Sequence, residues 1–361
     1  MTDHVGASTA KHKLQGIEAA RGVAAALVVV YHAARHLDAN GLGLPWAAGL
    51  ERFGHAGVDF FFVLSGFIIL FAHWGDVGRP DALPRYAERR CTRIFPLYWP
   101  VFAVSLALAV LGSRALRPDA GSLLANFLLL PTAEQPILGV AWTLQHEMLF
   151  YALFAVLLVS RPLGLALLVL WVAWVLSVAG GALERPLGGF GRVALSAYNV
   201  QFALGMASAW ILRRARVPAA GWVALLGACA FFATGLAESR GSVDGYGDFA
   251  RLLYGAAAWL FMLGIVERER ATGFRVPRLL AVLGQASYAI YLVHLLCIGL
   301  AFKLFERIGA TALHAHVQLA LLVALGIAGG VLVSRWIELP MTELARRSWA
   351  RATGRGKAVA S

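Results

Sequence analysis

The sequence has few charged residues and few cysteines for its length of 361 residues. Only 14% of its residues are charged and 59% are hydrophobic, whereas a soluble domain is about 25% charged and about 45 to 50% apolar. The three cysteines, Cys91, Cys229 and Cys297, are far apart, so neither a disulfide framework nor a cysteine metal site is predicted. These deficits exclude an ordinary soluble enzyme. They predict an integral membrane protein, for which we expect no metal and no cofactor.

Positive charge exceeds negative charge, with 32 Lys and Arg against 20 Asp and Glu and a net charge of +12. Nucleic-acid-binding proteins concentrate such charge on one solvated face of a soluble core. Because this composition does not provide a soluble core, we expect no nucleic-acid partner. The excess of Lys and Arg is better explained by membrane topology.

Ten apolar stretches of membrane-spanning length follow one another along the chain. We therefore predict an all-α polytopic membrane bundle of about ten transmembrane helices, with both termini on the same side. The run 121–131 is interpreted as a short re-entrant or interfacial helix. The ten stretches lie at about 14–34, 55–73, 94–113, 136–159, 162–181, 195–212, 218–237, 248–266, 279–303 and 314–337.

The distribution of Lys and Arg predicts which side each loop faces, because these residues accumulate in cytoplasmic loops. With the N-terminus taken as cytoplasmic, that side carries 20 basic residues and the opposite side carries nine. An N-in, C-in topology follows. The chain is then divided into a cytoplasmic segment 1–13, a membrane domain 14–340 and a basic cytoplasmic tail 341–361, which we expect to be disordered near anionic lipid.

Two ionisable residues, Arg21 and His32, lie inside the first predicted span. Such residues are costly in a membrane and usually face a cavity or a partner. Their separation of eleven residues is close to three helical turns, so they share one face and lie about 16 Å apart along the axis. Glu18 lies one turn before Arg21 and can pair with it. The alternative is an interfacial Glu18 and Arg21 pair, with His32 marking the far interface.

The second span opens with His55 and Asp59 and carries Ser65 in its middle. The first span ends where the second begins, so His55 and Asp59 are expected at the membrane level of His32. A carboxylate near an imidazole fixes its tautomer and stabilises the imidazolium. The alternative is that His55 and Asp59 are ordinary polar residues at the edge of a loop.

Arg90 and Arg93 lie in the segment 79–99, which we interpret as a cytoplasmic loop ahead of an aromatic-rich span. Residues three apart are neighbours on a helix, so two guanidinium groups at this spacing can grip one phosphate cluster. Coenzyme A, a sugar nucleotide or a lipid headgroup would fit. The alternative is an anchor of the kind that positive cytoplasmic loops provide.

The fourth span carries His146 and Glu147 beside Trp142. A carboxylate inside a membrane is a candidate for handling a proton, or a partner for Arg21 or His32 across the bundle. Purely structural pairing is the alternative.

The ninth span carries Ser287, Tyr291 and His294 with i, i+4, i+7 spacing, which places them on one helical face. They are interpreted either as a polar stripe that lines a cavity or as interhelical hydrogen-bonding groups. The run SRWIELP (334–340) is interpreted as an interface anchor that ends the last helix.

Taken together, five segments resemble, in order, the acyltransferase 3 family of membrane-bound acyltransferases. The resemblance runs from residue 14 to about residue 340. Within the family, the sequence is most similar to stand-alone O-acetylases of exopolysaccharides and surface glycans. The segments are LQGIEAARGVAAALVVVYH (14–32), GVDFFFVLSGFII (57–69), RRCTRIFPLYW (89–99), WTLQHEMLFY (142–151) and SYAIYLVH (287–294).

The resemblance implies that Arg21 and His32 are the family's Arg-x10-His pair, with His32 as the catalytic histidine. It also implies that Arg90 and Arg93 are its cytoplasmic Arg-x-x-Arg motif. Glu147 matches the acidic residue of the pattern Trp-Ser-Leu-x-x-Glu-x-x-Phe-Tyr. Two departures are Thr143 in place of Ser in that pattern, and Glu18 where the family often has Asp.

The expected function is an O-acyltransferase that moves a short acyl group, expected to be acetyl, from acyl-CoA to a sugar hydroxyl. Arg90, Arg93 and Arg21 would hold the donor. His32 would deprotonate the acceptor or carry the acyl group itself, and Asp59 and Glu147 are further catalytic candidates.

The expected partners are acyl-CoA, a glycan or lipid-linked sugar, membrane lipid and polysaccharide-synthesis proteins, and the expected location is the bacterial inner membrane. A proton-coupled exporter of a small acid or glycan is the leading alternative. A non-catalytic scaffold of a polysaccharide-synthesis complex is the third.

Overall fold

A computed structural model describes residues 14–42, 49–112, 118–132, 134–184, 188–273 and 275–353. In these ranges the secondary structure is helical, without a β-strand, so the predicted all-α bundle is confirmed. Segment 1–13 and the last residues of the tail, 354–361, lie outside the described residues. Ten long helices occupy the ten predicted stretches: α1 (Gln15–Ala39), α3 (Gly57–Ala72), α4 (Leu83–Leu111), α6 (Trp142–Val159), α7 (Arg161–Ala179), α9 (Tyr198–Arg214), α10 (Ala220–Ser239), α11 (Asp248–Thr272), α12 (Arg278–Ile308) and α13 (Ala315–Val333).

Nine candidate membrane spans are found among the described residues, and the shorter α9 is the tenth long helix. With 17 residues, α9 is about 25 Å long and at the lower limit for a span. The packing of α1 on α12 supports counting it. Gly22 lies against Gly284, and His32 lies beside His294, so the two helices run in the same direction. Seven long helices lie between α1 and α12 in the chain when α9 is counted. An odd number of intervening crossings makes α1 and α12 parallel, whereas leaving α9 out would make them antiparallel.

Shorter helices connect the spans, and proline and glycine mark several of their ends. The described residues include α2 (Leu50–Phe53), α5 (Ala120–Phe127), α8 (Gly189–Ala194) and α14 (Leu339–Ala352). Asp119 caps α5 through bonds from the backbone N–H groups of Gly121 and Ser122. This places a short helix within the predicted run 121–131. Gly309 ends α12 with a φ of 73°, which favours glycine.

Two sequence expectations are wrong, one at the start of α4 and one at the end of α13. The segment 79–99 is not a loop, because α4 begins at Leu83 and carries Arg90 and Arg93 on its second and third turns. The last helix does not end at SRWIELP either. A π-helix, Ser334–Glu338, links α13 to α14, which continues the helical path into the tail as far as Ala352. Pro340 lies at the start of α14, directly after this π-helical turn.

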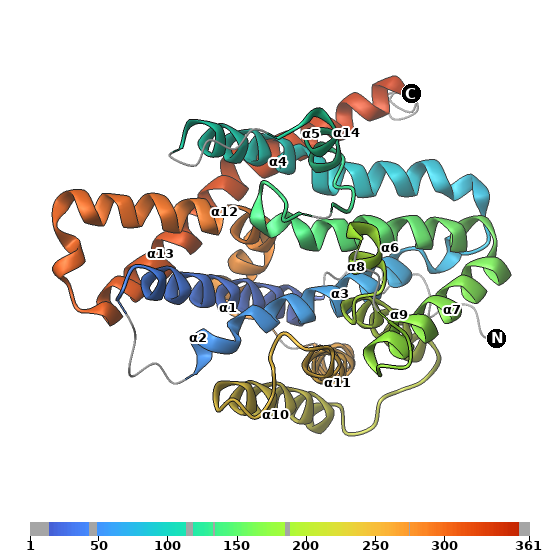
Figure 1. Cartoon of the computed structure of the whole chain (residues 1–361). Coiled ribbons are helices and arrows are strands. Elements are labelled where there is room, and N and C mark those ends of the chain that lie inside the picture. Colours follow the sequence, from blue (N-terminus) through green and yellow to red (C-terminus); the bar gives the residue numbers. More distant parts are fainter. Residues whose placement is uncertain are drawn as a thin grey trace.

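The helices pack as a bundle in which α1 lies between α10 on one side and α4 with α14 on the other (Figure 1). α1 packs against α12 and α13, α3 against α9 and α11, and α14 against α4. Close approach is possible where glycines remove side chains. A Cβ at Gly330 of α13 would lie 2.4 Å from the Cα of Ile290 in α12. This close packing fixes the distances between polar side chains on neighbouring helices.

The outer surface of the bundle is apolar, as expected for a protein surrounded by lipid. In α7, for example, the exposed side chains include Leu163, Val169, Leu170 and Trp174. A soluble protein rarely exposes such a continuous apolar surface. This surface and the long apolar helices establish a multi-pass membrane protein.

Candidate active site

A cavity of about 750 Å³ lies between α1, α3, α4, α6, α12 and α14. Its size is within the range of about 300 to 1,000 Å³ that is usual for small-molecule sites. Seven of the residues singled out from the sequence line it: Arg21, Ser65, Arg90, Arg93, Glu147, Ser287 and Tyr291. The helical periodicity of the first, third and ninth spans therefore brings distant motifs to one cavity. Glu18, His32, Asp59, Trp142, His146 and His294 are outside this lining.

Six arginines line the cavity against two carboxylates, Glu88 and Glu147. The arginines are Arg21, Arg89, Arg90, Arg93, Arg346 and Arg347. Three buried polar atoms of the lining, Arg21 Nε, Arg90 Nε and Ser287 Oγ, make no hydrogen bond to the described residues. Because unsatisfied donors are costly when buried, such atoms are suited to an anionic ligand.

The two arginines of the Arg-x-x-Arg motif are held by aromatic rings. The guanidinium of Arg90 lies 5.9 Å from the Tyr86 ring and 5.6 Å from the Tyr151 ring, at distances typical of cation–π contacts. Arg93 lies 5.1 Å from the Tyr288 ring and donates to Glu338 at 3.4 Å. These contacts restrict both side chains.

Three residues at the C-terminal end of the fold, Glu338, Arg346 and Arg347, belong to the site although their sequence context did not predict it. Glu338, placed in an interface anchor by its sequence context, is buried and accepts from Ser334 Oγ at 2.7 Å as well as from Arg93. Arg346 and Arg347 of α14 line the cavity. The signal that could have predicted α14 is the helix-forming composition of residues 341–352, which a disordered tail does not need.

Glu147 lies on the cavity wall and receives hydrogen bonds from two hydroxyls. Ser65 Oγ of α3 donates to its Oε1 at 3.3 Å, and Tyr151 Oη donates to the same oxygen. Arg21 is within electrostatic reach of Glu147, Glu18 and Glu338. Glu147 and Arg21 line the same cavity, but no ion pair or hydrogen bond joins Glu147 to Arg21 or to His32 among the described residues.

The end of the cavity near His32 is formed by Thr143 and Tyr291. Thr143 Oγ1 donates to Tyr291 Oη at 3.0 Å, and Tyr291 Oη donates to the backbone carbonyl of Val140 at 3.3 Å. One turn farther along α12, the ring of His294 lies 5.9 Å from that of Tyr291 and 4.8 Å from that of His32. Tyr291 is on the cavity wall, His294 lies behind it, and His32 lies behind His294.

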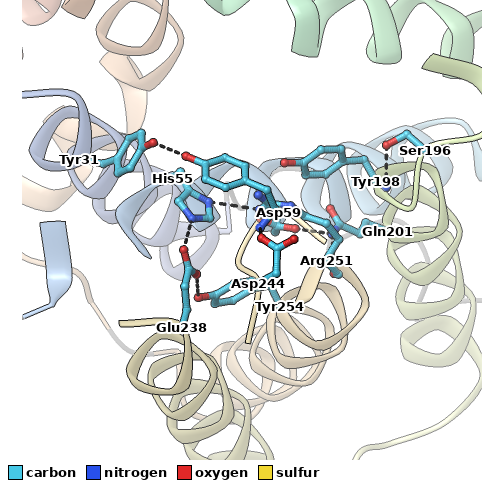
Figure 2. A network of polar contacts seen from close by, with 11 residues as sticks. Tyr31, His55, Asp59, Ser196, Tyr198, Gln201, Glu238, Asp244, Arg251 and Tyr254 are labelled. Atoms are coloured by element: carbon cyan, nitrogen blue, oxygen red, sulfur yellow. Dashed lines mark hydrogen bonds and ion pairs between the residues drawn. The ribbon is translucent and has the colours of Figure 1, made fainter. Parts of the chain in front are cut away.

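A second cluster of polar residues, which we call the buried network, joins α1, α3, α9, α10 and α11 (Figure 2). Arg251 Nη1 donates to Asp59 Oδ2 at 2.9 Å and to His55 Nδ1 at 3.2 Å. His55 Nε2 lies 2.7 Å from Glu238 Oε1, so with Nδ1 as acceptor it carries the proton. Asp59 thus pairs with Arg251, and the expectation that it orients His32 is not met.

The other members of the buried network add further hydrogen bonds, although Arg251 Nη2 and Gln201 Oε1 have no partner among the described residues. Gln201 Nε2 donates to Asp59 Oδ1 at 2.5 Å, Tyr254 Oη donates to Glu238 Oε2 at 2.5 Å, and Tyr31 bonds Tyr246. Asp59 and Arg251 are 0% and 2% exposed. Such a pair needs its partners within the protein.

His146 and Trp142 lie in an aromatic cluster rather than on the cavity wall. His146 Nδ1 is 3.1 Å from Asn199 Oδ1, and its ring contacts Phe62, Trp142 and Tyr198 at 5.6 to 5.8 Å between centroids. Purely structural pairing, the alternative given for the fourth span, therefore describes His146 and Trp142 best.

Outside the spans, Asp76 joins the end of α3 to the start of α4. Its carboxylate lies 2.8 Å from His73 Nδ1 and accepts from Arg85 at 2.9 Å. Burial raises the pKa of Asp76, but the bond to His73 and the charge of Arg85 outweigh it, so the pKa is lowered overall. This contact fixes the approach of α4 to the cavity. Among the described residues, no group of three His, Cys, Asp or Glu side chains is arranged to hold a metal.

Comparison with known proteins places these features in a family. Residues 14–336 match the model of the acyltransferase 3 family, described as an acyltransferase domain. The chain is 31% identical over 320 residues to the exopolysaccharide production protein ExoZ of Rhizobium meliloti (strain 1021), covering 84% of this chain and 94% of that protein. It is 28% identical over 359 residues to the putative membrane-bound transacylase BcsY of Komagataeibacter xylinus, covering 90% of this chain and 83% of that one.

A third relative is the acyltransferase MdmB of Streptomyces mycarofaciens, 28% identical over 319 residues, which cover 78% of this chain and 80% of the relative. No solved structure matches the chain. The family match covers most of the sequence and includes five of the six helices that build the arginine-lined cavity, while α14 lies beyond it. The protein is therefore a member of the acyltransferase 3 family of integral membrane acyltransferases.

Proposed function

We propose that this protein transfers a short acyl group, acetyl in the simplest case, from acyl-CoA to a hydroxyl of an exopolysaccharide or surface-glycan sugar. The observation that carries the proposal is the arginine-lined cavity, whose wall residue Tyr291 lies against His294, the neighbour of His32. The names of ExoZ and BcsY, which refer to exopolysaccharide production and transacylation, support the substrate class.

Arginines from three helices would hold the phosphates of the donor. Arg90 and Arg93 of α4 and Arg347 of α14 lie on the same cavity, and guanidinium groups bind phosphate through charge-assisted bonds. Arg21 lies deeper, on the helix that carries His32. An extended thioester arm entering past these arginines would follow the polar face of α1.

The reaction joins the acceptor oxygen to the acyl carbon and breaks the bond from that carbon to sulfur. In the direct route, neutral His32 takes the hydroxyl proton during the attack and returns it to the leaving thiolate. In the relay route, His32 first takes the acyl group and then passes it to the hydroxyl. Both routes give an ester and free coenzyme A.

The remaining proposals concern the surroundings of the enzyme. The basic cytoplasmic loops favour the bacterial inner membrane, with the arginine cavity open to the cytoplasm. The acceptor is a glycan or a lipid-linked sugar, and polysaccharide-synthesis proteins are the natural partners. No cofactor is needed for this chemistry.

The experiment is acyl transfer by purified protein in detergent. Release of free thiol from acetyl-CoA, with and without an added glycan acceptor, gives the rate, and mass spectrometry gives the acetyl increment on the glycan. Protein with His32→Ala is the control. Acceptor-dependent thiol release that the control lacks supports the proposal, and absence of release with any short acyl-CoA overturns acyl-CoA dependence.

The exporter alternative predicts a different outcome. Family membership favours the transferase, as does the clustering of arginines in one cavity. Proton-coupled glycan uptake into vesicles without thiol release would favour export instead.

A further inference from the structure

The imidazoles of His32 and His294 form a pair at the contact between α1 and α12. His32 Nδ1 lies 3.2 Å from His294 Nε2, and the ring centroids are 4.8 Å apart. His294 is completely buried. The hydrogen bonds around the pair determine which nitrogen of each ring carries the proton.

In His294, the proton lies on Nδ1. This atom is 2.7 Å from the backbone carbonyl oxygen of Tyr291 and 3.2 Å from that of Ile290. A carbonyl oxygen only accepts hydrogen bonds, so Nδ1 must be the donor. In a neutral ring the other nitrogen, Nε2, then carries a lone pair, and this lone pair faces His32.

In His32, the proton lies on Nδ1 for the same reason. This atom is 2.9 Å from the backbone carbonyl oxygen of Val28 and 3.2 Å from the lone pair of His294 Nε2. Both neighbours are acceptors, so Nδ1 donates to them. The neutral ring then has its lone pair on Nε2, which makes no hydrogen bond within the described part of the chain.

We propose that His294 is the positioning residue of His32: together with the Val28 carbonyl, it holds the imidazole of His32 in the tautomer whose Nε2 is free to receive the acceptor proton or the acyl group. This inference rests on the proposed function, since it assigns a role within that reaction. It replaces Asp59 as the orienting partner, because Asp59 is bonded to Arg251 and Gln201 instead.

The pair also limits how many protons it can hold. When His32 Nε2 takes a proton, Nδ1–H still points to the lone pair of His294, and the bond becomes charge-assisted. Protonation of His294 as well would place two N–H donors against each other. The other titratable or charged groups that face the pair are Tyr31 and Arg35 on α1, His55 beside α3, and Tyr291 on α12.

Two substitutions separate positioning from packing. His294→Leu keeps a bulky side chain but removes the acceptor, and we expect the kcat of acyl transfer to fall about 10- to 100-fold, with little change in the KM for acetyl-CoA. His294→Gln places an amide oxygen near the position of Nε2. It should recover most of the kcat, because it can still accept from His32 Nδ1–H.

The pH profile of kcat/KM gives a readout that a packing role would not change. In His294→Leu, the protonated His32 ring loses one of the two acceptors of its Nδ1–H and keeps the Val28 carbonyl, so the acidic limb should move to lower pH. In His294→Gln the limb should move back toward that of the wild type. Equal losses in the two variants with an unmoved acidic limb would overturn the proposal, as would a wild-type kcat in His294→Leu.

A matched control is His36→Leu. His36 is one turn beyond His32 on α1, where its ring contacts Phe302 of α12 at 4.8 Å without an imidazole partner. It should retain the wild-type kcat and pH profile. Melting temperatures in detergent identify any variant that is simply misfolded.

A spectroscopic measurement tests the tautomer independently of activity. Protein labelled with 15N in its histidine rings shows which nitrogens are protonated, and comparison with His32→Ala assigns the His32 signals. We expect protonated Nδ1 and unprotonated Nε2 in the neutral ring. If His32 is protonated on Nε2, the positioning role fails. If instead His32→Ala retains full activity, the proposed function of His32 fails, whatever the tautomer.

Discussion

The arginine cavity and the buried network both place charged groups inside the bundle, but they differ in how those charges are balanced. In the buried network, Asp59 pairs with Arg251 and His55 with Glu238, so the charges balance, although Arg251 Nη2 and Gln201 Oε1 make no hydrogen bond to the described residues. In the cavity, six arginines face two carboxylates, and buried donors remain without partners among the described residues. Charges that are paired with each other stabilise a fold, whereas an excess of one sign is suited to a ligand of the opposite sign.

The largest effect is expected at His32, which lies between the two regions. His32→Ala should lower the rate of acyl transfer by about 10² to 10⁴, the usual cost of losing a general base. Insertion, purification and acetyl-CoA binding should be unchanged, because the substitution removes a polar group from a helix in lipid. Thiol release and isothermal titration measure the two quantities. Full activity in this variant would exclude His32 from the mechanism.

The next effect tests whether the buried network is structural. Asp59→Asn leaves Arg251 without its carboxylate, and breaking a buried ion pair costs about 3 to 5 kcal/mol. The melting temperature in detergent should therefore fall, while acetyl-CoA affinity of the protein that remains folded should not change. The double variant Asp59→Leu with Arg251→Met should recover part of the stability. A normal melting temperature with a lost kcat would return Asp59 to the catalytic residues.

A smaller effect is expected for the donor arginines. Charge-assisted bonds contribute about 1.5 to 3 kcal/mol each, so Arg90→Gln or Arg93→Gln should weaken acetyl-CoA binding roughly tenfold or more, with little effect on the acceptor. Arg79→Gln, in an exposed turn before α4, is the control. Equal losses toward donor and acceptor would indicate a folding defect.

The smallest effect is expected at the exposed end of the cavity. Arg347 lines the cavity and pairs with Glu343 at 2.8 Å, with 68% of its side chain exposed. Solvent screening weakens such a contact, so Arg347→Gln should reduce acetyl-CoA affinity only a few-fold, more strongly at low salt. Arg351→Gln, on the same helix outside the cavity lining, should have no effect. Identical behaviour of the two variants would remove α14 from the donor site.

The sequence predicted those parts of the molecule that depend on local patterns. Span positions follow from apolar length, and the shared face of Ser287 and Tyr291 follows from the helical repeat. Both residues line the cavity. Contacts between distant segments could not be predicted in this way. Asp59 meets Arg251 across 192 residues, and His32 meets His294 across 262.

The end of the fold was mispredicted for a specific physical reason. Pro340 was interpreted as a stop, yet the chain is helical on both sides of it, and it lies directly after the π-helical turn at the start of α14. The basic residues that follow were assigned to lipid contact because their composition matches a cytoplasmic tail equally well. A charge pattern alone does not distinguish a helix that lines a cavity from a segment near a membrane.

The π-helical turn at 334–338 has a consequence for the phase of everything that follows it. Each residue of an α-helix rotates the chain by about 100°, and a π turn accommodates one residue more than an α turn. If the same five residues were wound as an α-helix instead, without any deletion, α14 would be rotated by roughly a quarter of a circle about its axis. Arg346 and Arg347 would then leave the cavity wall, although no residue that touches the cavity had been changed. Which side chains line the binding surface therefore depends on how this one turn is wound as well as on side-chain identity.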